Sequence, residues 1–377
     1  MVSAGADAQR LPPGVDANLL ARAVGGLLGA EHARLNEWWC RSIWEPRVTY
    51  TRGVYLCGGT ASVAREERKW AVVLKILAST QDGTPPLESY LYGSGFLGSL
   101  SGGLVAPRCL GVDTLPVGDM GVWLEHVTDT IGPAWPIERF GVMAYHLGEF
   151  SGAQTPDGEL PDWPWLRRGD LRGAVAERAS NVDALRTQLD HPLVRRAYPP
   201  DVADGFLGMW EEREVFLSAL DRVPHVVCHG DAQRRNVFAR DVPGADQRTV
   251  AVDWTNMRAW QAGTDAKTLV HQALMYFDAE VDSVWELDAA VFRGYMDGLS
   301  DAGWRGEEAA VRMGYVVQMA LGSVVLEIGP SLRMSLDESL RPWYEAVYGR
   351  PVEEILERRA GIGRFVLGLI QEVRSLL

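Results

Sequence analysis

The positions of strand-like and helix-like segments divide this chain into two unequal parts. Short runs rich in β-branched and aromatic residues, which are typical of strands, fall between residues 48 and 127. Beyond Thr128 most segments repeat apolar residues at helical spacing, ending in a long amphipathic stretch over Val352–Leu377. A chain of 377 residues has room for two such units. The pattern predicts an α+β fold of two lobes, a small antiparallel sheet followed by a larger, mainly helical part.

The first lobe is expected to hold a hairpin, an inserted helix and two further strands. The runs 47–56 (RVTYTRGVYL) and 70–77 (WAVVLKIL) predict the hairpin, with its turn at Gly58-Gly59. A helix over Leu87–Leu100 and two strands within residues 106–127 follow. Residues 1–47 are interpreted as an N-terminal segment whose amphipathic helix, Asp16–His32, packs on the lobes. The predicted divisions are therefore 1–47, 48–127 and 128–377, with the lobe boundary near residues 125–131.

Charge and cysteine content limit the partners. Lys and Arg number 37 against 50 Asp and Glu, a net charge of −13 that repels nucleic acid and acidic membranes, or serves only solubility. Cys40, Cys57, Cys109 and Cys228 are scattered without a CxxC pair, so free buried thiols are expected rather than a disulfide framework or a zinc site. Residues 1–13 lack the features of a secretory leader, and no membrane-length apolar run stands out. We expect a cytoplasmic protein whose partner is a small molecule.

The most informative segment is His225–Ala239 (HVVCHGDAQRRNVFA), in which an apolar run leads into a polar loop. The loop contains Asp231 and, five residues later, Asn236; the run TVAVDW then delivers Asp253. Phosphoryl transfer needs one carboxylate to accept or orient a hydroxyl proton, and an aspartate and an asparagine whose oxygens hold magnesium. The pattern HGDxxxxN arises by chance in a chain of this length with odds on the order of one in a thousand. The alternative is structural: Asp231 caps a turn and Asn236 satisfies loop backbone.

A cation for the nucleotide phosphates is also present. Lys75 lies inside the apolar run WAVVLKIL, where a lysine is costly unless it meets an anion. Glu88, near the start of the next helical segment, is the expected partner, although Glu66 and Glu67 are also near in sequence. The alternative is a lysine at the edge of the sheet that reaches solvent.

Together, HGDAQRRN, the later VDW, and VLK with a helical glutamate upstream resemble the aminoglycoside phosphotransferase and choline kinase family, relatives of the protein kinases, over residues 48–275. The resemblance implies a bilobal protein-kinase-like fold. It implies Mg²⁺ as cofactor and ATP or GTP as donor. The sequence departs from the protein-kinase pattern at two points. No GxGxxG motif precedes the second strand, so the nucleotide loop is expected around residues 49–53, and Asp253 is followed by Trp254-Thr255 in place of Phe-Gly. The implied roles are Asp231 as base, Asn236 and Asp253 as metal ligands, Lys75 and Glu88 at the phosphates, Glu125 and Val127 in the adenine-binding linker, Gly53 in the nucleotide loop, and His229 and Asp265 as braces of the catalytic loop. For Asp265 the alternative is a plain helix N-cap.

The acceptor site is expected in the second lobe, over the catalytic loop. Aromatic rings that stack on sugars, together with carboxylates, suit a sugar or an amine, whereas arginines suit the transferred phosphate or an acidic acceptor. Each of these residues is also common in packing or on solvated surfaces. The candidates are Trp163, Trp165, Arg234, Arg235, Tyr276, Asp278, Glu280 and Trp285.

The sequence thus predicts a kinase that phosphorylates a hydroxyl of a small molecule. We favour an antibiotic acceptor of aminoglycoside or nucleoside type, so that modification gives resistance. The alternatives are a metabolic kinase for a sugar, choline-like or amino-alcohol substrate, a catalytically silent nucleotide-binding regulator, and a protein kinase. Both a monomer and a homodimer remain open, since the final helix can pack on its own lobe or on a second copy.

Overall fold

A computed structural model describes residues 10–30, 33–44, 50–80, 83–242 and 247–377. The chain forms two compact units. Unit 1 comprises Met1–Ser101, Val105–Thr130 and Phe238–Thr255, and unit 2 comprises Gly102–Leu104, Ile131–Val237 and Asn256–Leu377. Unit 1 contains the helix Ala17–Leu28 and the strand Arg34–Trp44 from the predicted N-terminal segment, and the chain returns to unit 1 after residue 237.

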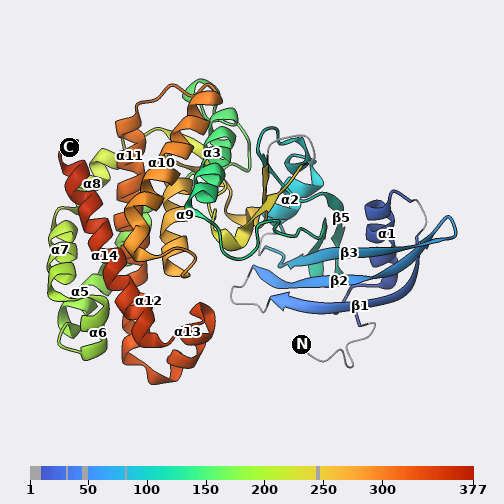
Figure 1. Cartoon of the computed structure of the whole chain (residues 1–377), viewed down its shortest axis with the longest axis horizontal. Coiled ribbons are helices and arrows are strands. Elements are labelled where there is room, and N and C mark those ends of the chain that lie inside the picture. Colours follow the sequence, from blue (N-terminus) through green and yellow to red (C-terminus); the bar gives the residue numbers. More distant parts are fainter. Residues whose placement is uncertain (1–9, 31–32, 45–49, 81–82, 243–246) are drawn as a thin grey trace. The chain divides into compact units, whose positions relative to one another are not determined.

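Unit 1 is built on an antiparallel sheet that α1 (Ala17–Leu28) covers on one face (Figure 1). Within the described residues the sheet has five strands in the order β1-β2-β3-β6-β5. Leu20 and Val24 of α1 are fully buried against Leu74 and Trp123 of the sheet, which explains the apolar face seen in the sequence. The strands are β1 (Arg34–Trp44), β2 (Thr51–Val63), β3 (Glu66–Leu77), β5 (Cys109–Thr114) and β6 (Met120–Glu125).

Further short elements complete unit 1. The helix α2 (Leu87–Gly93) packs on β5 and β6, and is shorter than predicted because a separate 3-10 turn, Leu97–Ser99, follows it. The returning segment carries β8 (Val237–Arg240) and β9 (Arg248–Ala251), which are neighbours in a second small sheet. The 3-10 turn Pro116–Gly118 also belongs to unit 1, whereas β4 (Leu104–Val105) and the 3-10 turn Trp254–Asn256 each contain residues of both units.

The predicted turn at Gly58-Gly59 is wrong. Both glycines lie inside β2, opposite Trp39 and Trp38 of β1. A Cβ at position 58 would lie 2.7 Å from the Trp39 ring, and one at position 59 would lie 2.1 Å from the Glu37 carbonyl oxygen, so only glycine fits. The hairpin turns instead at Ala64 and Arg65, whose φ angles of 49° and 74° are those of a tight hairpin turn.

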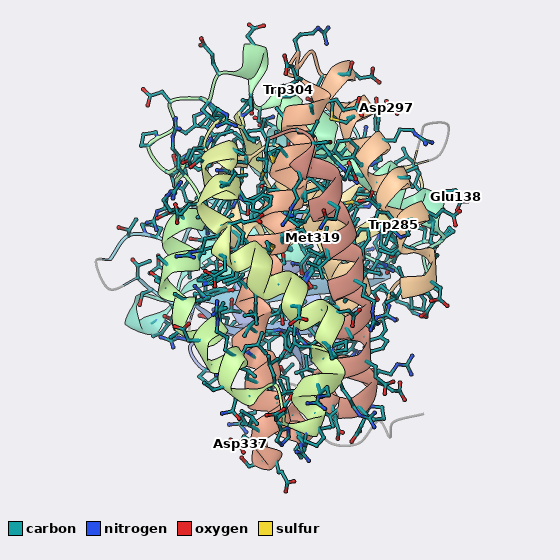
Figure 2. The ribbon with its side chains drawn as sticks, turned by 90° about the vertical axis from the view of Figure 1, so that its left-hand side faces the viewer. Glu138, Trp285, Asp297, Trp304, Met319 and Asp337 are labelled. Atoms are coloured by element: carbon teal, nitrogen blue, oxygen red, sulfur yellow. A yellow bond between two sulfur atoms is a disulfide. The ribbon has the colours of Figure 1, made fainter. Side chains whose placement is uncertain are left out.

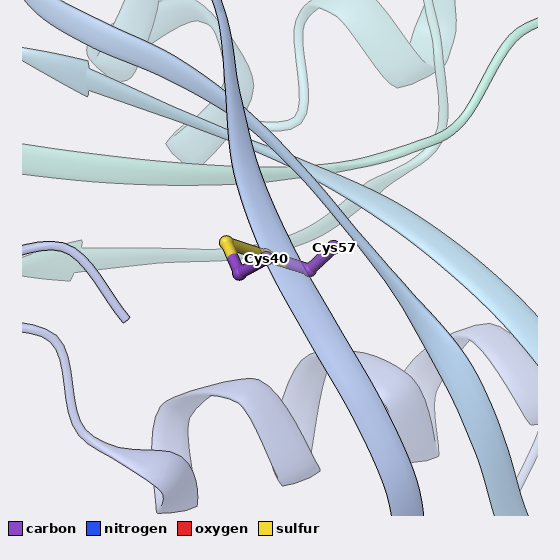
Figure 3. Close-up of a disulfide and its surroundings, with 2 residues drawn as sticks. All are labelled: Cys40 and Cys57. Atoms are coloured by element: carbon purple, nitrogen blue, oxygen red, sulfur yellow. A yellow bond between two sulfur atoms is a disulfide. The ribbon is translucent and has the colours of Figure 1, made fainter. Parts of the chain in front are cut away.

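The expectation of four free thiols is wrong for Cys40 and Cys57. They face each other across the antiparallel pair of β1 and β2 and form a disulfide (Figure 3). Cys109 and Cys228 are free. The pairing follows from the register of β1 on β2, which residue spacing alone does not reveal.

Unit 2 is mainly helical, with one small antiparallel pair, β7 (His225–Cys228) and β10 (Arg258–Gln261) (Figure 1). Gly148 and Gly298 let α3 and α10 approach closely, because a Cβ at either position would lie 2.1 Å or 2.0 Å from a carbonyl oxygen of the other helix. The helices are α3 (Ile137–Ala153), α4 (Leu171–Glu177), α5 (Ala179–Gln188), α6 (Pro192–Ala197), α7 (Pro200–Glu211), α8 (Arg213–Leu220), α9 (Thr264–Met275), α10 (Val284–Asp301), α11 (Glu308–Val317), α12 (Val325–Leu336), α13 (Arg341–Tyr348) and α14 (Val352–Arg374), with 3-10 turns at Pro156–Gly158, Arg234–Asn236, Val281–Ser283 and Glu338–Leu340.

One continuous helical run, Glu308–Leu336, joins α11 to α12 through the π-helical turn Gln318–Val324. By length and composition this run could span a membrane, since its most apolar 18-residue window has a mean hydropathy of 1.5. However, 78% of that window is buried inside the fold. Met319, in the π-helical turn, is fully buried and lies behind the outer helices in Figure 2. The run is therefore the core helix of unit 2.

Candidate active site

In unit 1, Lys75 lies between two carboxylates. Its Nζ is 2.5 Å from Oε2 of Glu88 and 2.6 Å from Oδ1 of Asp253. The side chains of Lys75 and Glu88 are 9% and 1% exposed, whereas that of Asp253 is 31% exposed, so only Asp253 opens to solvent. Burial alone would lower the pKa of Lys75, but the two carboxylates raise it above its ordinary value and keep the ammonium charged. Lys75 does not reach solvent at a sheet edge, because β3 lies between β2 and β6.

Thr255 also belongs to this cluster, although no sequence motif marks it. Its hydroxyl lies 3.0 Å from Oε2 of Glu88 and 3.0 Å from Oδ1 of Asp253, so it links the two carboxylates that hold Lys75. Asp253 itself has a φ of 62°, a left-handed conformation that non-glycine residues rarely adopt. Asp253 lies between the end of β9 at Ala251 and the short 3-10 turn Trp254–Asn256. Nothing in the sequence pattern distinguishes Thr255 from an ordinary turn residue.

In unit 2, the loop 229–236 presents Asp231 and Asn236 side by side. The Nδ2 of Asn236 donates to Oδ2 of Asp231 at 2.9 Å and to its backbone oxygen at 3.1 Å. The Nε2 of Gln233, a residue that the sequence analysis did not single out, donates to the other carboxylate oxygen at 2.9 Å. Two amide donors therefore fix the orientation of the Asp231 carboxylate. Because the amide nitrogen of Asn236 faces Asp231, its oxygen Oδ1 faces away.

A buried aspartate fixes the backbone of the same loop. Asp265, in the first turn of α9, accepts hydrogen bonds from the backbone N–H groups of His229 (2.7 Å) and Gly230 (2.9 Å). Burial raises the pKa of Asp265 to about 6, against the lowering effect of these two hydrogen bonds. The ring of His229 is fully buried, and its Nδ1 accepts the backbone N–H of Asp231 at 3.3 Å. Asp265 thus contacts the loop directly, and it is not the N-cap of its own helix, because that position is Gly263.

Gly230 is required by geometry. Its φ is 82°, and a Cβ at this position would lie 2.2 Å from the backbone oxygen of Asn256. The loop therefore crosses the chain that enters β10 at a distance that only glycine allows.

The remaining nucleotide-side candidates lie in unit 1. Glu125 ends β6, and its carboxylate accepts from the backbone N–H of Arg108 (3.1 Å) and from Arg240 (2.7 Å), so it fastens β6 to the neighbouring chain segments. Val127 follows it and is half-buried. In the predicted nucleotide loop, Thr49 lies outside the described residues, and Gly53 pairs with Ile76 inside β2.

The structure separates the acceptor candidates into distinct environments. The rings of Trp163 and Trp165 stack on each other with centroids 4.7 Å apart, and Trp285 packs edge-on against Phe365 of α14, at the margin of the helices in Figure 2. Arg234 is buried and donates to the backbone oxygens of Val237 and Gly132. Tyr276, Asp278 and Glu280 belong to one loop after α9, which also contacts Arg235 and Arg358.

Two of the predicted metal ligands carry hard oxygen donors of the kind that magnesium prefers, Oδ1 of Asn236 in unit 2 and the carboxylate of Asp253 in unit 1. Among the described residues, no group of three or more His, Cys, Asp or Glu side chains is arranged to hold a metal ion.

The two units have the α+β architecture of the protein-kinase-like fold, as predicted. Among solved structures, an aminoglycoside phosphotransferase from Alicyclobacillus acidocaldarius is similar at 15% identity and a TM-score of 0.53, over 84% of this chain and 90% of that one. An amicoumacin kinase is similar at 14% identity and a TM-score of 0.48, over 85% and 88% of the two chains. A choline kinase from Cryptosporidium parvum matches at 10% identity and a TM-score of 0.48, over 90% of both chains.

At these identities the first likeness shows the fold, and it confirms the fold class predicted from the sequence. This first structure is that of an aminoglycoside phosphotransferase, which is the family that the motifs resemble. No protein-family model matches the chain. A search of curated proteins gives no match either.

Proposed function

We propose that the protein is a small-molecule kinase, which transfers the γ-phosphate of ATP or GTP to a hydroxyl group of its acceptor. The observation that carries this proposal is the position of Lys75, a buried ammonium held by Glu88 and by the more exposed Asp253. A lysine paired with a helical glutamate beside a metal-binding aspartate is the arrangement that aligns nucleotide phosphates in kinases. The similarity in fold to an aminoglycoside phosphotransferase supports the same conclusion.

In the proposed mechanism, Lys75 binds the nucleotide phosphates, and Glu88 and Thr255 keep it in place. Asn236 and Asp253 hold the magnesium ion, which neutralises charge on the phosphates when it is bound. Asp231, oriented by Gln233 and Asn236, accepts or orients the proton of the attacking hydroxyl. Asp265 and His229 keep the backbone of the loop in the conformation that presents Asp231. Glu125, Val127 and the start of β2 at Gly53 are proposed to border the nucleotide.

For the acceptor, the sequence favours an antibiotic of aminoglycoside or nucleoside type, and a metabolic sugar, choline-like or amino-alcohol substrate is the alternative. Both classes of acceptor occur in the cytoplasm, which is the compartment proposed for this protein. Either acceptor requires the same catalytic residues. The two hypotheses therefore differ only in the residues that bind the rest of the acceptor molecule.

The test is a phosphate-transfer screen. The purified protein is incubated with magnesium and ATP or GTP and with a panel of antibiotics, sugars and amino alcohols, and mass spectrometry detects the gain of one phosphate. We expect transfer to at least one acceptor by the wild type and none by the Asp231→Ala variant. Tight nucleotide binding without transfer to any acceptor would favour a silent regulator, and phosphorylation of protein alone would favour a protein kinase.

A further inference from the structure

Arg235 is an exposed cation in the loop that carries Asp231 and Asn236. Its guanidinium carbon lies 3.8 Å from the centroid of the Tyr276 ring, and that ring stacks in turn on Tyr348 of α13, with centroids 5.5 Å apart. Stacking covers one face of a guanidinium but leaves its in-plane N–H donors available. Within the described part of the chain, no carboxylate lies within ion-pair distance of Arg235. The stack therefore holds an unpaired cation next to the proposed metal ligand.

The neighbouring arginines are already used by the fold. Arg234 donates to two backbone oxygens and lies over the Trp135 ring. Arg358 donates to the backbone oxygens of Leu274 and Ala279 and pairs with Glu280 at 3.2 Å. Arg235 and Arg350, which lies over the Phe277 ring, are thus the guanidiniums of this group that are left for a ligand, and of these two Arg235 lies in the loop that carries Asp231.

Asp278 supplies an acceptor beside this cation. Its Oδ2 is buried, and no described residue donates a hydrogen bond to it. Burial raises the pKa of Asp278, although the charges of Arg235, Arg234 and Arg358 act in the opposite direction. A buried carboxylate oxygen without a donor is unfavourable, and a ligand hydroxyl or ammonium group would satisfy it.

The charge of the surroundings is positive. Around Phe277 and Asp278 lie four guanidiniums, from Arg234, Arg235, Arg350 and Arg358, against the two carboxylates of Asp278 and Glu280. Like charges at short range oppose binding, so a polycationic acceptor is disfavoured here.

We propose that Arg235 and Asp278 form the acceptor-recognition pair, and that the acceptor is a small hydroxylated molecule carrying an anionic group, a carboxylate or a phosphate. Arg235 binds the anion, and Asp278 accepts a hydrogen bond from a hydroxyl or ammonium group of the same molecule. This inference rests on the proposed kinase function, and it narrows the acceptor away from aminoglycosides.

Binding is measured first, because it does not depend on turnover. Isothermal titration calorimetry uses glycerate and glycerol 3-phosphate as carboxylate and phosphate probes, with glycerol as the neutral counterpart. We expect at least one of the two anionic probes to bind more tightly than glycerol, and we expect Arg235→Gln to raise the Kd of that probe at least tenfold. Arg235→Lys should give an intermediate Kd, because it keeps the charge but loses the planar stack. Arg293→Gln, at an exposed position on α10, is the matched control and should leave all three Kd values unchanged.

Kinetics then separate the acceptor from the nucleotide. For acceptors found in the transfer screen, Arg235→Gln should raise KM for anionic acceptors at least tenfold and change the nucleotide Kd by less than twofold. Asp278→Asn should raise KM for anionic and neutral acceptors alike, because the proposed hydrogen bond to the hydroxyl or ammonium group does not depend on the anion.

Several results would overturn the inference. These are equal binding of glycerol and both anionic probes, tighter anion binding by Asp278→Asn, an equal loss of nucleotide affinity in Arg235→Gln, or a lower KM for polycationic aminoglycosides than for anionic acceptors. Failure of the kinase proposal is distinguishable, since the wild type would then transfer no phosphate to any acceptor, whereas the calorimetric comparison of the three probes does not depend on turnover.

Discussion

The Nζ of Lys75 lies 2.6 Å from Oδ1 of Asp253, a residue 178 positions further along the chain. The cation comes from the middle strand of the sheet and the carboxylate from the segment that returns to unit 1. Glu88 on α2 completes the cluster, so three distant parts of the chain meet at one ammonium group. Removal of Lys75 leaves the buried Glu88 carboxylate without a cation, and removal of either carboxylate leaves the ammonium with a single partner, which makes the cluster sensitive to mutation.

Lys75→Ala should weaken nucleotide binding and turnover together. It should also lower the free energy of unfolding by about 3–5 kcal/mol, because Glu88 would remain buried without a cation. Lys69→Ala is the matched control, since Lys69 lies on the same strand and is exposed. Calorimetric nucleotide titration and urea unfolding measure both effects. Unchanged nucleotide affinity and turnover in Lys75→Ala would contradict the proposed role.

Asp231→Ala should abolish turnover and leave nucleotide binding largely intact. Loss of a group that accepts or orients the proton typically costs about 10²–10⁴-fold in rate. The measurement is kcat with the best acceptor from the screen, beside nucleotide Kd. A variant that keeps even a tenth of the wild-type kcat would rule out the assigned role.

Asp265 should make stability depend on pH in a definite direction. Its pKa is raised by burial to about 6 in the folded protein, so between about pH 4 and pH 6 the native state binds more protons than the unfolded chain. The free energy of unfolding should therefore fall by about 3 kcal/mol as pH rises through this window, and Asp265→Asn should remove that component.

Urea unfolding of wild type and Asp265→Asn across this pH range tests the effect through the difference between the two proteins. His271, whose pKa is lowered by burial to about 4, gives the opposite slope, but it is present in both proteins and cancels. A difference that grows in favour of the wild type as pH rises would contradict the prediction.

Reduction of the Cys40–Cys57 disulfide should destabilise unit 1. The bond links residues 17 positions apart, and a crosslink of this span contributes about 3 kcal/mol. Chemical unfolding with and without a reductant measures the loss. A Cys40→Ser, Cys57→Ser double variant should be insensitive to the reductant, whereas Cys109→Ser should respond like the wild type. Equal stability of the wild type in both conditions would count against the bond.

Gly230→Ala should be more damaging than Gly303→Ala. Both glycines have positive φ, 82° and 93°, so both substitutions carry the cost of a left-handed residue, about 1–2 kcal/mol. A Cβ at position 230 would in addition meet the Asn256 oxygen at 2.2 Å, whereas position 303 has nothing within 4 Å. Unfolding midpoints and kcat of the two variants compare them. Similar losses of stability and kcat in both variants would show that the loop at Gly230 does not approach the Asn256 backbone closely.

The loop motif was predictable because its residue types and spacing are tied to one chemical task. Asp231 and Asn236 contact each other, as a separation of five residues around a tight loop allows. Lys75 was recognisable because a lysine in an apolar strand needs an anion. Thr255 and Gln233 gave no such signal, since a hydroxyl or an amide in a polar loop is common, and only the folded chain shows what each one contacts.

The first strand was not predicted because it lies at an edge of the sheet. In β1 only Cys40 is buried, so the alternation of apolar and polar residues that marks a half-buried strand is weak. The same strand explains two other differences. The Trp39 indole occupies the space beside Gly58, the backbone of Glu37 and Trp38 occupies the space beside Gly59, and the register of β1 on β2 brings Cys40 to Cys57.

The return of residues Phe238–Thr255 to unit 1 also affects the order of events during synthesis. A ribosome releases the amino-terminal sheet long before it releases β9 and Asp253. Until then the Lys75 ammonium has only Glu88 as a partner, and the nascent unit lacks one of its three stretches. Translation must proceed well into the second unit before the first can complete its fold. A chain truncated before residue 238 would therefore contain the five-stranded sheet, Lys75 and Glu88 but not Asp253.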